Sequence, residues 1–272
     1  MATRMGKSMP DYDAVAPILQ SSGTGRALIE PSEQIKPIDI PKACVISFFM
    51  NEINRLHQAG KAKKLKRLKS ELGGHIVYKM ETDGEAVALF HPGVGGPLAA
   101  GLFEEVIAMG CDRFVVCGGC GVLDASMEAG KLLVVEAALR DEGTSYHYLP
   151  PAQDVCPSES AVRAIEDSLR EEGLDFLRVK TWTTDAFFRE TPAKIELRKS
   201  QGCRVVEMEA ASLFAVARFR NVQIGQILYA GDDLSGEKWQ SRGWSKQKEL
   251  RGALIQMAAR AVLRIRPEQE NY

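Results

Sequence analysis

The sequence lacks both a long apolar run and a strong bias in charge. Its 272 residues carry 35 Lys and Arg against 36 Asp and Glu, a formal net charge of −1. Such neutrality excludes the global basic field that drives non-specific nucleic-acid binding, so no nucleic-acid partner is expected. No stretch approaches the ~18 apolar residues of a membrane span, and the opening MATRMGKSMPDYD has no apolar stretch behind its charges. We therefore expect no membrane partner, no signal peptide and a cytoplasmic location.

The sequence also lacks internal repeats, low-complexity tracts and a complete metal-binding motif. The nearest approach to a metal motif is Cys117-Gly-Gly-Cys120, a C-x-x-C spacing found in redox sites and in half of a zinc site. The second half of a zinc site is missing. We interpret the six cysteines as reduced residues of the core or of a pocket wall, rather than as redox or metal residues.

The character of the sequence changes near residue 42. Residues 1–42 contain SSGTG and EPSEQIKPIDIPK without a sustained hydrophobic period, and we interpret them as an N-terminal extension or arm. From residue 43 the run ACVISFF is apolar throughout, as expected of a buried strand. A single α/β domain can reach about 250 residues, so residues 43–272 are expected to form one domain.

Predicted strands and helices alternate along this domain. Several of the strands are apolar on both faces, which predicts a three-layer α/β/α fold around a mixed, mostly parallel central sheet. Residues 50–69 are predicted to be helical, with the basic run 61–69 as a solvated helix face; an anion-binding edge or a subunit contact is the alternative. Further strands are expected within 73–80, 85–90, 111–119, 131–139, 177–184, 203–209 and 222–231, and further helices within 95–110, 158–173, 191–200, 210–220 and 248–265.

Six of the predicted strands end in segments rich in glycine, hydroxyl, carboxylate or aromatic residues. Ligands of α/β folds gather at the carboxyl ends of strands, so these segments predict one shared pocket. They are HPGVGGP, CGGCG, RDEGTSYHY, TTDAFFRE, EMEAA and GDDLSG. The loop HPGVGGP lacks the G-K-[ST] of a Walker A loop; it is either a tight connection or a backbone-lined anion or sugar site at a helix start.

The acidic residues of these segments are candidates for binding and catalysis. Glu207 and Glu209 both lie at the end of a buried strand, and we expect one to face the pocket and the other to face packing or a subunit contact. The 2′,3′-diol of a ribose is one partner for such a carboxylate, and an Arg or a backbone N–H is the other. Asp232 is either an Asx-turn residue or a general acid aimed at a leaving group. Phe187 is either a core or interface residue or a ring that stacks on a planar ligand.

Taken together, the motifs resemble the nucleoside phosphorylase-I family, which includes purine nucleoside phosphorylases, uridine phosphorylases and related nucleosidases. The resemblance covers about residues 43–265 and rests on GVGGPLAAGLFEEV, RFVVCGGCGVL, RDEGTSYHY, TTDAFFRE, VVEMEAASLF and the strand ending in GDD. It implies a nucleoside phosphorylase-like fold and an enzyme that cleaves the N-glycosidic bond of a nucleoside by phosphorolysis, giving free base and (deoxy)ribose 1-phosphate. Inorganic phosphate would be the co-substrate, and no other cofactor is implied.

The resemblance also implies roles for single residues. Glu209 would hydrogen-bond the ribose hydroxyls, Met208 would pack beneath the sugar and Phe187 would contact the base. Asp232 would protonate or hydrogen-bond the departing base, an interaction that strengthens as negative charge develops there. Further substrate contacts are assigned to Glu207 and, through their backbone, to Gly95, Gly96, Gly118 and Gly119.

The expected phosphate site departs from the family pattern. Phosphorylases of the family carry an arginine where this chain has Val116, and a hydroxyl residue where it has Gly119. A phosphate dianion needs charge-assisted donors, and Arg55 and Arg140 are the candidate replacements.

Three functions therefore remain open. They are phosphorolysis with a rebuilt phosphate site, hydrolysis by a nucleosidase of the same fold, and non-catalytic nucleoside binding on an inherited fold. The retained Glu209 and Asp232 argue against the third. The Gln and Arg that read uracil in uridine phosphorylases fall near Thr191 and Ala193, so uracil specificity is not indicated. Because the family commonly builds its sites between subunits, a homo-oligomer, either dimer or hexamer, is implied.

Overall fold

The structure, a computed structural model, describes residues 16–19 and 25–266. Parts of the predicted N-terminal arm, residues 1–15 and 20–24, lie outside these ranges, and the division of the chain at residue 42 stays a prediction. In the described ranges no helix is long and apolar enough to cross a membrane.

The described strands form one ten-stranded mixed sheet, which confirms the predicted α/β class. Neighbouring strands follow the order β10-β6-β8-β9-β5-β1-β4-β3-β2, and β7 pairs with β6. Strand β10 also pairs in parallel with β5, so that β5, β10, β6, β8 and β9 close into a ring. The strands are Ala43–Ser47 (β1), Ala62–Ser70 (β2), Gly73–Thr82 (β3), Glu85–Phe90 (β4), Arg113–Val122 (β5), Leu132–Asp141 (β6), Asp154–Val155 (β7), Phe176–Thr184 (β8), Cys203–Glu207 (β9) and Gln223–Asp233 (β10).

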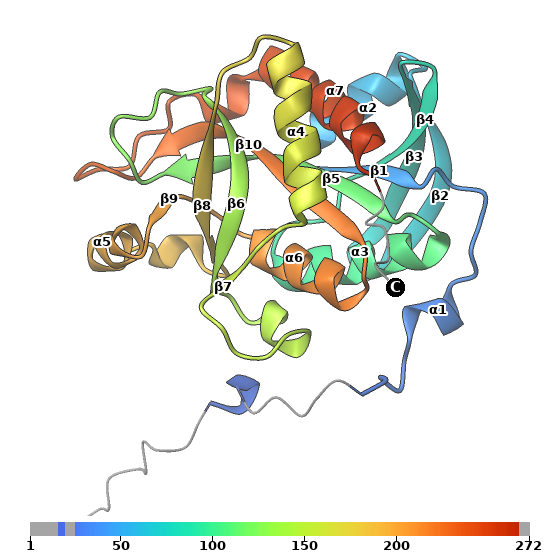
Figure 1. The fold of residues 1–272 in the computed structure, drawn as a ribbon, viewed down its shortest axis with the longest axis horizontal. Coiled ribbons are helices and arrows are strands. Elements are labelled where there is room, and N and C mark those ends of the chain that lie inside the picture. The colour runs from blue at the N-terminus through green and yellow to red at the C-terminus, as the bar shows by residue number, and fades with distance from the viewer. Residues whose placement is uncertain (1–15, 20–24, 267–272) are drawn as a thin grey trace, which may run out of the picture.

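Helices cover both faces of the sheet, as the three-layer prediction requires (Figure 1). Helices α2, α4 and α7 pack on one face and share a core with Val45, Cys117 and Ile227. Helices α3 and α6 pack on the other face with Val116 and Leu228, because successive strand residues point to opposite sides. The helices are Pro31–Gln34 (α1), Met50–Gln58 (α2), Gly96–Met109 (α3), Glu159–Glu171 (α4), Pro192–Ser200 (α5), Ala210–Phe219 (α6) and Lys248–Arg264 (α7), with 3₁₀ turns at Pro17–Leu19, Thr144–His147, Phe187–Arg189 and Trp244–Lys246.

The basic segment 61–69 is an edge strand, so the prediction of a helix there is wrong. Helix α2 ends at Gln58, and Gly60 follows with a φ of 72°, a left-handed conformation that suits glycine and stops the helix. Among the described strands, β2 pairs with β3 alone; it buries Ala62 and Leu68, while most of its other side chains are exposed. Exposed lysines are common on edge strands, where they disfavour pairing with another chain.

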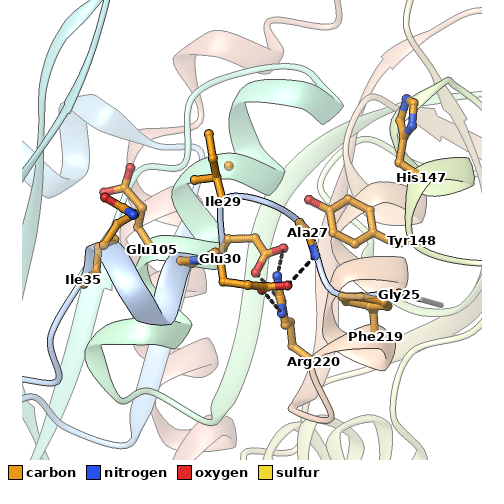
Figure 2. Close-up of a pocket in the computed structure, with 14 residues that line it drawn as sticks. Gly25, Ala27, Ile29, Glu30, Ile35, Glu105, His147, Tyr148, Phe219 and Arg220 are labelled. Atoms are coloured by element: carbon orange, nitrogen blue, oxygen red, sulfur yellow. Dashed lines mark hydrogen bonds and ion pairs between the residues drawn. The ribbon is translucent and has the colours of Figure 1, made fainter. Parts of the chain in front are cut away.

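Residues 25–35 of the predicted arm lie against α3 and the end of α6, where they frame a cavity of about 500 Å³ (Figure 2). Arg220 donates to Glu30 Oε2 (2.9 Å) and to Glu104 Oε2 (2.6 Å). The N–H of Ala27 donates to Glu30 Oε1 (2.9 Å). These charge-assisted contacts tie the arm to the domain, and His147 also lines this cavity. None of the site residues predicted from the sequence lines this cavity.

Candidate active site

A larger cavity, of about 890 Å³, lies where β5, β9 and β10 end. Its walls come from the ends of these strands, from the Phe187–Arg189 turn and from the start of α7. The strand ends meet there as expected of an α/β sheet. Of the residues predicted from the sequence, it gathers Gly118, Gly119, Phe187, Glu207, Met208, Glu209 and Asp232.

Glu207 lies in the cavity wall, but its carboxylate oxygens are occupied by protein donors. Oε2 accepts the backbone N–H groups of Glu209 (2.8 Å) and Ala210 (2.6 Å) at the start of α6. Oε1 accepts the hydroxyls of Thr183 (2.6 Å) and Thr181 (3.3 Å). Burial raises the pKa of Glu207, and these four donors oppose the rise. The residue therefore fixes the strand-to-helix turn that presents Glu209.

Replacing Glu207 with alanine is expected to lower the free energy of unfolding by about 3 kcal/mol, because buried backbone N–H groups and the Thr183 hydroxyl lose their acceptor. Glu207→Gln keeps one amide oxygen for the backbone donors and serves as the matched control, with a loss of about 1 kcal/mol or less. Urea unfolding followed by circular dichroism measures both. Equal stability of the two variants would show that Glu207 does not anchor α6.

Glu209, the N-cap residue of α6, is buried and meets the glycine loop before α3. Its Oε1 accepts the N–H of Gly95 at 2.6 Å. Gly95 has a φ of 88°, a left-handed conformation that favours glycine and turns this N–H toward the carboxyl group. Burial and the charge of Glu207 raise the pKa of Glu209 to about 8. A carboxylate has about four acceptor sites, so Glu209 can still accept hydrogen bonds from a ligand diol.

Asp232 and three aromatic residues form another part of the same cavity. Asp232 Oδ2 accepts a hydrogen bond from Trp239 Nε1 at 2.7 Å. Phe187 and Phe188 follow β8, their ring centroids lie 4.1 Å apart, and they are 52% and 87% exposed. Exposed aromatic rings beside a carboxyl group offer stacking and hydrogen bonding to a planar heterocycle.

Glu190, a residue that the sequence analysis did not single out, completes this part of the cavity. Its carboxyl group lines the cavity and makes no hydrogen bond or ion pair with the described residues. Burial and the nearby charge of Asp232 raise its pKa to about 7, while Lys194 opposes the rise. In the sequence, Glu190 is the last residue of TTDAFFRE, a segment that follows a predicted strand. A carboxylate at that place could have been predicted to line the pocket, as Phe187 was.

The glycines divide between the cavity and the packing behind it. Gly118 and Gly119 line the cavity; a Cβ on Gly118 would lie 3.3 Å from the Phe48 ring, and one on Gly119 would lie 3.0 Å from the Tyr229 ring. Gly96 instead packs inside the fold, where a Cβ would lie 2.4 Å from Ser212 Oγ. Its absence of a side chain permits close packing at the start of α3.

The two arginines predicted for phosphate binding are not brought to the cavity. Arg140 is buried and donates to Ser145 Oγ and to the carbonyl oxygens of Leu149 and Pro150. Arg55 points to solvent and pairs with Glu52 at 2.7 Å. Both arginines bind groups close to them in the sequence, and neither of them lines the cavity.

Among the described residues, Arg251 is the one Lys or Arg that lines the cavity. It belongs to α7, on the sheet face opposite α6, and donates to Tyr229 Oη and to the carbonyl oxygen of Trp244, both at 3.0 Å. The α6 side of the cavity, where Glu209 lies, therefore contains no cationic side chain from the described residues.

Comparison with known proteins identifies a family whose sequence pattern this chain matches. The family model described as "Phosphorylase superfamily" matches residues 42–265. A guanosine phosphorylase of Halorubrum lacusprofundi is 30% identical over 145 residues, which cover 53% of this chain and 60% of the relative. In three such curated relatives the matched part makes up 57% to 62% of the length.

Solved structures share the fold over most of the chain. The AMP nucleosidase of Bacteroides thetaiotaomicron superposes with a TM-score of 0.67 at 22% identity, covering 85% of this chain and 90% of that one. The purine nucleoside phosphorylase of Toxoplasma gondii superposes with a TM-score of 0.68 at 20% identity, covering 86% and 93%. At these identities the likeness is one of fold.

Proposed function

The chain belongs to the phosphorylase superfamily, and from this premise we propose that it is an enzyme that cleaves the N-glycosidic bond of a nucleoside. The observation that carries the proposal is the joint presence in one cavity of Glu209 and Asp232. The first suits a sugar diol and the second suits a leaving base. The exposed aromatic rings that line the same cavity suit a planar base.

The proposed reaction follows from these positions. Glu209 holds the ribose hydroxyls and so fixes C1′, while the base lies beside Asp232 and Phe187. As the C1′–N bond breaks, electrons pass to the base, and Asp232 donates a proton or hydrogen bond to it. A developing oxocarbenium ion at C1′ then receives an oxygen nucleophile.

We further propose inorganic phosphate as the first candidate for this nucleophile. The guanosine phosphorylase related to this chain supports it, as do Gly118 and Gly119, whose backbone lines the cavity without a side chain in the way. Hydrolysis is the second candidate. It is favoured by the fully buried Val116 and by the absence of a cationic side chain on the Glu209 side of the cavity, within the part of the chain that the structure describes.

The decisive experiment incubates the protein with purine and pyrimidine nucleosides and nucleotides, with and without phosphate. Free base with sugar 1-phosphate supports phosphorolysis, and free base with free sugar at a rate independent of phosphate supports hydrolysis. Absence of turnover on every substrate would refute the enzymatic proposal and leave a nucleoside-binding protein.

For the base, we propose a purine that carries a ring N–H, such as hypoxanthine or guanine. Two carboxyl groups, Glu190 and Asp232, face the same part of the cavity, and Glu190 has no donor from the described residues. A carboxylate accepts hydrogen bonds, so it favours a base edge that donates them. The 30% identity with a guanosine phosphorylase agrees with this choice.

Replacing Glu190 with alanine is expected to lower kcat/KM for inosine by about 100-fold, since the base N–H loses its charged acceptor. The wild-type protein should prefer inosine over 1-methylinosine by a similar factor, and the variant should lose most of that preference. Steady-state rates of base release measure both. The exposed Glu196→Ala serves as the matched control, and an unchanged preference in Glu190→Ala would contradict the role in base recognition.

A further inference from the structure

Gln226 is a buried polar residue whose side-chain oxygen has no hydrogen-bond partner among the described residues. It lies in β10 between apolar neighbours and is 1% exposed. Its Oε1 accepts no hydrogen bond from the described residues. A buried amide left in this way is costly, and native proteins pair such groups with protein, water or ligand. A bound ligand would supply the partner that the described residues do not give this side chain.

A ligand can reach the amide from the cavity, which Gln226 lines together with Phe48, Gly118 and Leu228. Along β10, Ile224 and Leu228 belong to the core on the α3 and α6 face, while Ile227 belongs to the opposite face. By this alternation the amide points to the face that also holds the Glu209 carboxyl group at the start of α6.

Gln226 is also the register partner of Val116 in the neighbouring strand β5. Val116 is fully buried and belongs to the core on the same face. It stands where the family pattern places an arginine, so the amide of Gln226 is the polar group that this part of the cavity offers instead. An amide differs from arginine in being neutral and in combining a donor with an acceptor.

We propose that Gln226 binds the oxygen nucleophile that replaces the base at C1′, an assignment that rests on the proposed glycosidic cleavage. Nε2 donates to an oxygen of the nucleophile, and Oε1 accepts its O–H. Water and monohydrogen phosphate share this chemistry, since each presents an acceptor oxygen and an O–H. Gln226 thereby orients an oxygen lone pair toward C1′.

The step balances for either nucleophile. The C1′–N bond breaks and its electron pair passes to the base, which takes a proton from Asp232. An oxygen of the nucleophile forms the C1′–O bond and loses one proton, which restores the Asp232 carboxyl group through solvent. The products are free base with ribose from water, or free base with ribose 1-phosphate from monohydrogen phosphate.

The test replaces Gln226 with leucine, which has a similar volume and no polar atoms. Gln226→Met is a second variant of similar shape in case the first folds poorly. Gln223→Leu is the control, since Gln223 opens the same strand but bonds Ser160 Oγ instead of lining the cavity. Each variant is assayed for Tm, for nucleoside Kd by calorimetry, and for rates of base release over a range of phosphate concentrations.

We expect Gln226→Leu to keep or raise Tm, because a buried unpaired amide is replaced by an apolar group. Nucleoside Kd should stay within about threefold, while base release at saturating nucleoside falls by about 30-fold or more. If the nucleophile is phosphate, its KM rises by about tenfold or more; if it is water, the loss is the same at every phosphate concentration. The control should stay within about threefold of wild type in all three measurements.

Two results would overturn the assignment in distinguishable ways. Base release by Gln226→Leu or Gln226→Met at the wild-type rate and phosphate KM would refute the role of Gln226 and leave the glycosidic cleavage standing. Absence of base release by the wild-type protein itself, on any nucleoside, would refute the cleavage and the role of Gln226 with it.

Discussion

Glu209→Ala is expected to lower kcat/KM for a purine nucleoside by about 10³-fold, which corresponds to about 4 kcal/mol of transition-state stabilisation. The carboxyl group is buried, lines the cavity and accepts the N–H of Gly95. The variant removes the acceptor for the ribose hydroxyls, so C1′ is no longer held in place against the nucleophile. Steady-state base release measures the loss, and circular dichroism checks that the variant folds.

Glu209→Gln is the matched control, because an amide oxygen can still accept the N–H of Gly95. The glutamine amide accepts fewer hydrogen bonds than a carboxylate can. We therefore expect Glu209→Gln to lower kcat/KM by about 10- to 100-fold. Turnover of Glu209→Ala close to the wild-type rate, with the fold intact, would remove the ribose-binding assignment.

The same residue gives the binding step a pH dependence. With a pKa of about 8, the carboxyl group of the free protein is mostly protonated at pH 7, and accepting both hydroxyls of a diol favours its ionised form. Nucleoside binding should therefore release a proton, and affinity should rise as pH increases from 6 to 8. Calorimetry in buffers of different ionisation enthalpy counts the protons. Because the pKa of Glu190 is also raised, to about 7, the contribution of Glu209 is the part of the release that Glu209→Gln abolishes.

Asp232→Asn is expected to lower kcat for inosine by about 10²- to 10³-fold, the range of a lost general acid. Asparagine can still accept the Trp239 N–H that Asp232 now accepts, so the loss reports the proton rather than the local fold. The base of 7-methylguanosine departs without needing a proton, and its turnover should fall by about tenfold at most. Equal losses on the two substrates would rule out proton donation by Asp232.

Asp233→Asn is the control for this substitution. The neighbouring carboxylate points away from the cavity lining, where it accepts from the N–H and Oγ of Ser235 and pairs with Arg242. Its loss should reduce stability, measured by urea unfolding, more than the rate of base release. A fall in kcat as large as that of Asp232→Asn would point to loop structure rather than chemistry.

Most elements of the fold could be predicted because their burial follows a local period. Helix α4 begins after Ser158, as its apolar pattern indicates, and β5, at Arg113–Val122, overlaps the strand predicted within 111–119. The segment 61–69 shows where such reasoning fails. Lysines occur at the exposed positions both of a helix face and of an edge strand, and the choice was made by Gly60 and by pairing with β3.

Some residues of the candidate site could be predicted from the sequence, and others could not, because their role depends on contacts between distant segments. Glu209 and Asp232 end predicted strands, and ends of strands meet in an α/β sheet. Arg140 was a candidate phosphate-binding residue in the sequence, but its N–H groups donate to Ser145 and to two backbone carbonyl groups. Gln226 had no such signal, since one glutamine in an apolar strand does not reveal whether a partner lies across from it.

By itself the sequence determined the alternation of strands and helices, the order of the motifs and the acids that end the strands, because these depend on residues close along the chain. Only the tertiary structure decided which polar groups are already satisfied. Glu207 has four protein donors, whereas Glu190 and Gln226 have none from the described residues. Two of the donors to Glu207, the hydroxyls of Thr181 and Thr183, come from β8, which is distant in sequence. The unsatisfied groups in the cavity are the ones that a ligand can bind.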